Sequence, residues 1–65
     1  MRISFGSDER THLTGFIEQE LCGRGHQVQL VGPLAGEPLQ WADVARAVAE
    51  RVSTGEADTG VLCCW

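Results

Sequence analysis

Two short segments at opposite ends of the chain carry the side chains best suited to chemistry. Asp8 follows the apolar run MRISFG, and Cys63 and Cys64 end the apolar run TGVLCC. A carboxylate can accept hydrogen bonds from a ligand, and a thiol becomes reactive where a cation or a helix N-terminus stabilises its thiolate form. The first question for the fold is therefore whether it brings these two segments together.

Each of these residues also has a purely structural interpretation. Asp8 precedes an amphipathic segment, where a short polar side chain can cap a helix, although Ser7 or Thr11 could cap it equally well. The pattern alone favours capping for Asp8, with ligand contact as the alternative. It also favours core packing for the cysteines, because unpaired cysteines in apolar strands are usually buried. Successive strand residues point to opposite faces, so Cys63 and Cys64 cannot both face one site.

Composition excludes several classes of function. The 65 residues allow at most one small domain, and the net charge is −4. All five cations are arginines, scattered along the chain, so we expect no nucleic-acid partner. The absence of lysine excludes Schiff-base chemistry and a P-loop. The chain shows no targeting segment and no membrane-length apolar run, so we expect a cytoplasmic protein that does not enter a membrane.

The spacing of potential ligands predicts neither a metal site nor a bound cofactor. His12 and His26 stand at no metal-like distance from the three cysteines, and the chain contains no C-x-x-C pair. The glycines at positions 6 and 15 are too far apart for a dinucleotide-binding fingerprint.

Apolar periodicity in the first half predicts a strand, a helix and a second strand. Residues 1–6 alternate in polarity and end at Gly6, and residues from about 10 to 24 have helical spacing. The apolar stripe of this helix, which we expect to face the core, is Leu13, Phe16, Ile17 and Leu21. Residues 26–32 form a strand with one polar face, carrying Gln27 and Gln29, which suits the edge of a sheet.

The second half predicts another helix and a third strand. The helical stripe is Trp41, Val44, Ala45, Val48 and Val52. The pattern favours a core position for Trp41, with a ligand-lining position as the alternative. Residues 59–65 form a continuous apolar run, typical of a strand covered on both faces.

Alternating strands and helices predict an α/β fold, a three-layer, doubly wound (Rossmann-like) parallel sheet. The polar-faced second strand belongs at an edge and the apolar third strand inside, which gives the strand order 2-1-3 with one helix on each face. The first and third strands then end side by side, where open α/β sheets bind ligands. In a sheet of these three strands alone, the third strand would be a long hydrophobic edge strand. We therefore expect residues 1–65 to be the N-terminal part of a larger domain, which further residues or another chain complete.

Several motifs resemble the type B ribose-5-phosphate isomerases, the family that includes the galactose-6-phosphate isomerase subunits. They are MRISFGSDE, GRGHQVQLVGP and WADVARAVAERVSTGEADTGVLCC, in this order. The resemblance implies a dimer or tetramer that interconverts aldose and ketose sugar phosphates through an enediol, without a cofactor. It implies that Cys64 moves the proton between C1 and C2 and that Asp8 contacts the substrate. Trp41 matches a tyrosine that lines the pocket.

The chain departs from this family at four positions. Glu9 stands where the family usually has a substrate-contacting histidine, so the resemblance implies a substrate contact at Glu9 as well. Trp65 stands where a glycine follows the catalytic cysteine. Gln40 and Ala42 replace an aspartate and a proline of the D-Y-P-D motif, while Asp43 keeps its second aspartate. The family's later histidine and arginines have no counterpart, so we expect this chain to be inactive by itself. The alternative to an isomerase is a non-catalytic structural subunit or binding module on the same scaffold.

Overall fold

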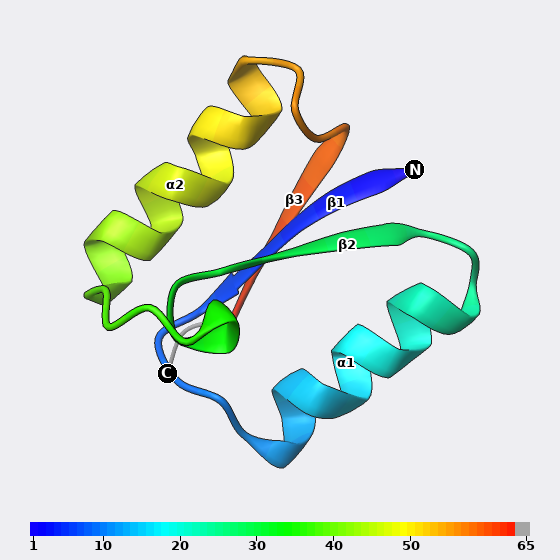
Figure 1. The fold of residues 1–65 in the computed structure, drawn as a ribbon, viewed down its shortest axis with the longest axis horizontal. Helices are drawn as coiled ribbons and strands as arrows, with labels where there is room; N and C mark the ends of the chain where they lie inside the picture. The colour runs from blue at the N-terminus through cyan, green and yellow to red at the C-terminus, as the bar shows by residue number, and fades with distance from the viewer. Residues whose placement is uncertain (64–65) are drawn as a thin grey trace.

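The computed structural model describes residues 1–63, and Cys64 and Trp65 lie outside the described residues. The elements follow in the order β1 (Arg2–Ser7), α1 (His12–Gly23), β2 (Gln27–Val31), a short 3-10 helix η1 (Gly32–Ala35), α2 (Trp41–Ser53) and β3 (Thr59–Cys63) (Figure 1). This β-α-β-α-β order is the one that the apolar periodicity predicts. Neither α1 nor α2 is long and apolar enough to cross a membrane.

The strands form one parallel sheet in the order β2-β1-β3, which confirms the predicted topology. The helices α1 and α2 lie on opposite faces of this sheet (Figure 1). Register pairs Gly6 of β1 with Val31 of β2 and with Leu62 of β3. The three strands therefore run in the same direction and end along one edge of the sheet, which we call the carboxyl edge.

The face covered by α2 is closely packed because β1 and β3 present glycines to the helix. A Cβ atom at Gly6 would lie 2.6 Å from Val44 Cγ1 and 2.8 Å from Val48 Cγ2. A Cβ atom at Gly60 would lie 2.7 Å from Val48 Cγ1. The absence of these side chains lets the helix approach the backbone of the sheet, and Val44 and Val48 are buried with Val31 in the core.

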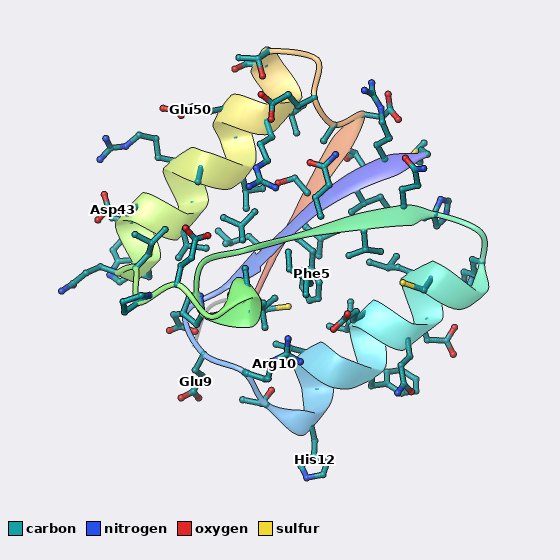
Figure 2. All side chains as sticks on the ribbon, in the orientation of Figure 1. Phe5, Glu9, Arg10, His12, Asp43 and Glu50 are labelled. Atoms are coloured by element: carbon teal, nitrogen blue, oxygen red, sulfur yellow. The ribbon has the colours of Figure 1, made fainter. Side chains whose placement is uncertain are left out.

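The face covered by α1 is packed less completely than the sequence predicts. Phe5 of β1 is fully buried and points toward this face (Figure 2), but Thr14 is the one buried residue of α1. Leu13 and Phe16 are 50% and 60% exposed, which corrects the expectation that the whole stripe faces the core. The helix packs mainly along β2 at the sheet edge, so residues 1–63 leave part of its apolar stripe uncovered.

Two further expectations are corrected at the helix starts. The helix α1 begins at His12 rather than near residue 10, because Thr11 caps it. Trp41 is 61% exposed and does not belong to the core, because it is the first residue of α2 and the buried positions of that helix begin one turn later at Val44. The predicted stop of α1 is confirmed by Gly25, whose φ of +87° favours glycine.

Candidate active site

The carboxyl edge brings together the two segments that the sequence singles out. Ser7, the last residue of β1, pairs in register with Cys63, the last residue of β3. Asp8 follows Ser7 directly, so it lies at the point where these neighbouring strands end. Cys64 follows Cys63 in the chain but lies outside the described residues, and its predicted role therefore stays a prediction.

Thr11, and not Asp8, caps the helix α1. The Thr11 Oγ1 accepts a hydrogen bond from the Thr14 backbone N–H at 3.3 Å, and the Thr14 Oγ1 accepts one from the Thr11 N–H at 2.8 Å. This reciprocal pair is a capping box, which satisfies N–H groups that the first helical turn leaves without partners. The capping interpretation that the sequence favours for Asp8 is therefore wrong.

The carboxylate of Asp8 has a buried oxygen without a hydrogen-bond partner among residues 1–63. Its Oδ1 is shielded from solvent, and no described residue donates a hydrogen bond to it. Buried polar atoms in folded proteins almost always have a partner, and a buried carboxylate without one is costly. This state marks Asp8 as the carboxylate at the carboxyl edge whose hydrogen bonds the described residues do not supply.

The backbone after Asp8 is held by the side chain of Ser7. The Ser7 hydroxyl donates to the Glu9 carbonyl at 2.8 Å and accepts from the Glu9 N–H at 3.3 Å. Ser7 itself is fully buried, so this turn is anchored from inside the protein. The Glu9 side chain is exposed and points away from the sheet (Figure 2). Sequence reasoning identified Glu9 as a departure from the family, and the structure places it next to Asp8 in the same turn.

Arg10 is a residue of this edge that sequence reasoning did not assign. Its guanidinium lies between η1 and the start of α1 (Figure 2) and donates to the Leu34 carbonyl at 2.7 Å. A second nitrogen lies 3.7 Å from the Glu18 carboxylate. The available signal was its place in the sequence SDERT, two residues after the candidate site residue and directly before the helix cap.

Trp41 lies at the same edge of the sheet as Asp8. The helix α2 begins there because Val44 packs over Gly6, close to the end of β1. The exposed indole of Trp41 is therefore available to line a site, the alternative that the sequence left open. Asp43, two residues later, is exposed and pairs with Arg46 at 3.0 Å within the helix.

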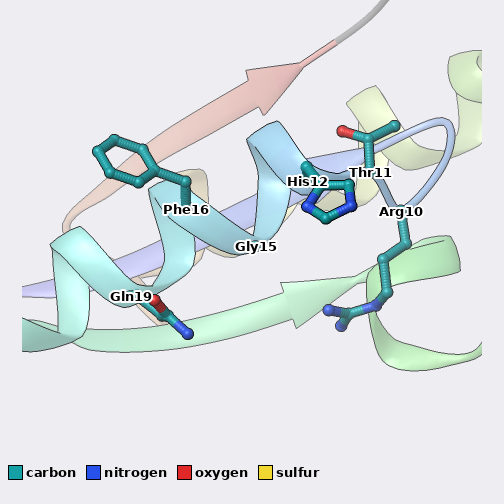
Figure 3. Close-up of a pocket in the computed structure, with 6 residues that line it drawn as sticks. All are labelled: Arg10, Thr11, His12, Gly15, Phe16 and Gln19. Carbon is teal, nitrogen blue, oxygen red and sulfur yellow. The ribbon is translucent and has the colours of Figure 1, made fainter.

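An open hollow of about 540 Å³ lies on the surface of α1 rather than between the ends of β1 and β3 (Figure 3). Its lining residues are Arg10, Thr11, His12, Gly15, Phe16 and Gln19. Asp8, Glu9 and Trp41, the predicted site residues that the structure describes, take no part in it. Residues 1–63 also contain no group of three side chains that could hold a metal ion.

Comparison with known proteins identifies the scaffold. A family model described as Ribose/Galactose Isomerase matches residues 3–65. The chain therefore belongs to the ribose/galactose isomerase family, as the sequence motifs and the strand order indicate. No curated protein matches the chain.

Similarity to a solved structure extends to both fold and sequence. The chain is similar to ribose-5-phosphate isomerase B of Clostridium thermocellum, with 35% sequence identity, a TM-score of 0.81 and 98% of this chain covered. It spans 44% of the length of that protein. The likeness confirms the Rossmann-like sheet and its strand order.

Proposed function

We propose that residues 1–65 are the N-terminal part of a single α/β domain that isomerises a phosphorylated sugar between its aldose and ketose forms. The substrate is ribose 5-phosphate with its product ribulose 5-phosphate, or a close analogue, and the complete protein is a dimer or tetramer. Membership of the ribose/galactose isomerase family supports the reaction class. The likeness to a ribose-5-phosphate isomerase B supports this substrate.

The observation that carries the proposal is the Asp8 carboxylate beside the paired ends of β1 and β3, whose Oδ1 accepts no hydrogen bond from residues 1–63. A sugar presents several hydroxyl groups, each of which can donate a hydrogen bond to such an acceptor. A hydrogen bond that involves a charged group contributes about 1.5–3 kcal/mol, enough to orient a small polar substrate.

In the proposed reaction, Cys64 removes the proton from C2 of the open-chain aldose and returns it to C1. Loss of the C2 proton leaves an enediolate with its charge on O1, and the hydroxyl proton at O2 then moves to O1. The proton held by Cys64 returns to C1 as O2 becomes the ketose carbonyl oxygen, so atoms and charge balance. Asp8 holds the substrate hydroxyls, and Trp41 forms a wall of the site. The enediolate needs donors aimed at its oxygen, and these, like the groups that bind phosphate, come from the rest of the domain.

Turnover of ribose 5-phosphate by the complete protein tests the proposal. We expect Cys64→Ala to abolish turnover because it removes the base, and Cys63→Ala to retain it because the neighbouring residue of a strand points to the other face. Circular dichroism would show that both variants are folded. Unchanged turnover in Cys64→Ala would show that Cys64 is not the base.

Glu9 and Trp65 favour a second candidate, a non-catalytic relative on the same scaffold. The exposed Glu9 carboxylate stands where the resemblance implies a histidine, and a carboxylate repels a phosphate that a histidine would bind. Alkylation of Cys64 in the presence of ribose 5-phosphate separates the candidates. The isomerase predicts that the sugar phosphate protects this thiol, and an unchanged alkylation rate would favour the non-catalytic protein.

A further inference from the structure

The segment between β1 and α1, residues 8–11, is fastened to its surroundings on both sides of Asp8. The Ser7 hydroxyl holds the Glu9 backbone, and the Thr11–Thr14 capping box fixes the start of the helix. Both contacts are local, since their partners are two and three residues apart. Local contacts shape the turn, but they do not fix its position relative to the rest of the carboxyl edge.

Arg10 supplies a contact that reaches beyond this segment. Its hydrogen bond to the Leu34 carbonyl joins residues 24 positions apart in the sequence. Leu34 is buried in η1, directly after β2, so the accepting carbonyl belongs to a packed part of the structure. The Glu18 carboxylate, 3.7 Å away, approaches the same guanidinium from α1. Arg10 therefore joins the segment that carries Asp8 to η1 and to α1.

The chemistry of arginine suits this role. The planar guanidinium has five N–H donors in a fixed arrangement, so one side chain can serve a carbonyl and a carboxylate together. A charge-assisted hydrogen bond to a carbonyl is stronger than a neutral one. The contact is half-buried, which protects it in part from competition by water.

We propose that Arg10 is a positioning residue, which holds the segment of residues 8–11 against η1 so that the Asp8 carboxylate stays at the carboxyl edge. This inference rests on the proposed function of Asp8 as a substrate contact. Arg10 acts through Asp8 and does not touch the substrate. A shift of about 1 Å in a substrate-positioning group can cost about a hundredfold in rate, so such a contact matters to activity.

The first test compares Arg10→Met with a matched control in the complete protein. Methionine keeps the unbranched stem and removes the guanidinium. Arg24→Met removes a guanidinium that is exposed and bonds to Glu20 within α1, without reaching another element. We expect Arg10→Met to raise KM for ribose 5-phosphate about tenfold with a smaller change in kcat, and Arg24→Met to change neither. We expect Arg10→Lys to recover part of the loss, because an ammonium can still donate to the Leu34 carbonyl.

A double-mutant cycle with Asp8 separates positioning from direct substrate contact. If Arg10 acts through Asp8, Arg10→Met lowers kcat/KM much less in an Asp8→Ala background than in the wild type. An equal loss in both backgrounds would show that Arg10 contributes on its own, and would overturn the proposal.

Amide hydrogen exchange tests the same contact without any activity. We expect Arg10→Met to accelerate exchange in residues 8–11 about tenfold, whereas Arg24→Met leaves this segment unchanged. Absence of turnover in the wild-type protein would contradict the proposed function but would not affect this measurement. Unchanged exchange in Arg10→Met would overturn the proposal, whatever the enzyme assay shows.

Discussion

The two faces of the sheet are covered by helices of similar length, yet they are packed very differently. On the α2 face, Gly6 and Gly60 let Val44 and Val48 approach the strands so closely that no Cβ atom would fit between them. On the α1 face, a buried Phe5 underlies a helix whose Leu13 and Phe16 are largely exposed. Glycine in the strands, rather than apolar content in the helix, decides how completely each face is packed here.

The two sides of the candidate site are also held in place in different ways. The packed α2 face fixes the carboxyl edge from one side, since Val44 lies over Gly6 near the end of β1. The looser α1 face is joined to that edge through the hydrogen bond from Arg10 to the Leu34 carbonyl. Close packing therefore fixes the position of α2 on the sheet, whereas hydrogen bonds fix the start of α1.

The largest expected effect comes from filling the space at Gly6. We expect Gly6→Val to destabilise the complete protein by about 3 kcal/mol, because its Cβ would lie 2.6 Å from a methyl group of Val44. Gly15→Ala on α1 is the control, since a Cβ there meets nothing within 4 Å. Alanine is the better helix former, so we expect this control to stabilise by up to about 1 kcal/mol. Urea unfolding would measure both, and equal effects would contradict the contrast between the faces.

A smaller effect is expected from truncating one apolar side chain on each helix. Val44→Ala removes two buried methyl groups and should cost about 2 kcal/mol of unfolding free energy. Leu13→Ala should cost less than about 1 kcal/mol, because half of that side chain is already exposed. A loss at Leu13 as large as that at Val44 would show that the complete protein covers the α1 stripe.

The start of α1 provides a third contrast, between a capping residue and a site residue. Thr11→Ala removes half of the capping box and should lower the unfolding free energy by about 1 kcal/mol. Asp8→Ala removes a buried carboxylate oxygen that has no partner among residues 1–63, so we expect no loss of unfolding free energy. Thermal or urea unfolding measures both variants, and a larger loss at Asp8 would restore its interpretation as a cap.

The smallest expected effect is on the pH dependence of unfolding, and it comes from the end of the sheet opposite the site. Hydrogen bonds from the Arg2 guanidinium and the Arg2 backbone N–H lower the pKa of Asp58 below its ordinary value. Ionised Asp58 therefore stabilises the fold above the ordinary pKa of an aspartate, about 4, and this contribution is lost as the pH falls through the lowered value. We expect Asp58→Asn to reduce the acid sensitivity of unfolding slightly. An unchanged pH profile would show that the exposed ion pair contributes nothing.

The strand order was predictable because a strand with one polar face suits the edge of a sheet, although no residue of the apolar β3 is buried within residues 1–63. Gln27 and Gln29 mark β2 as an edge strand, and the apolar third strand belongs on the far side of β1. The helix cap was not predictable, because Ser7, Asp8 and Thr11 can all accept a backbone N–H. Only the backbone geometry, which brings the Thr14 N–H to the Thr11 side chain, decides among them.

The packing of the helix faces was predictable in part. Spacing shows which side chains of a helix lie on one stripe, but it does not show how much of that stripe another element covers. Leu13 and Phe16 therefore belong to the predicted stripe and are nevertheless exposed. Trp41 is exposed for a different reason. It is the first residue of α2, and the helix meets the sheet only at Val44. Arg10 was missed because its partner, the Leu34 carbonyl, is a backbone atom and leaves no signal in the sequence.

The measurement that tests the account most directly is kcat/KM of the complete protein with Asp8→Ala, using ribose 5-phosphate. The account predicts a loss of about 10- to 100-fold, the equivalent of one charge-assisted hydrogen bond to the substrate, with the unfolding free energy unchanged. Wild-type activity in this variant would contradict the assignment of the carboxyl edge as the active site.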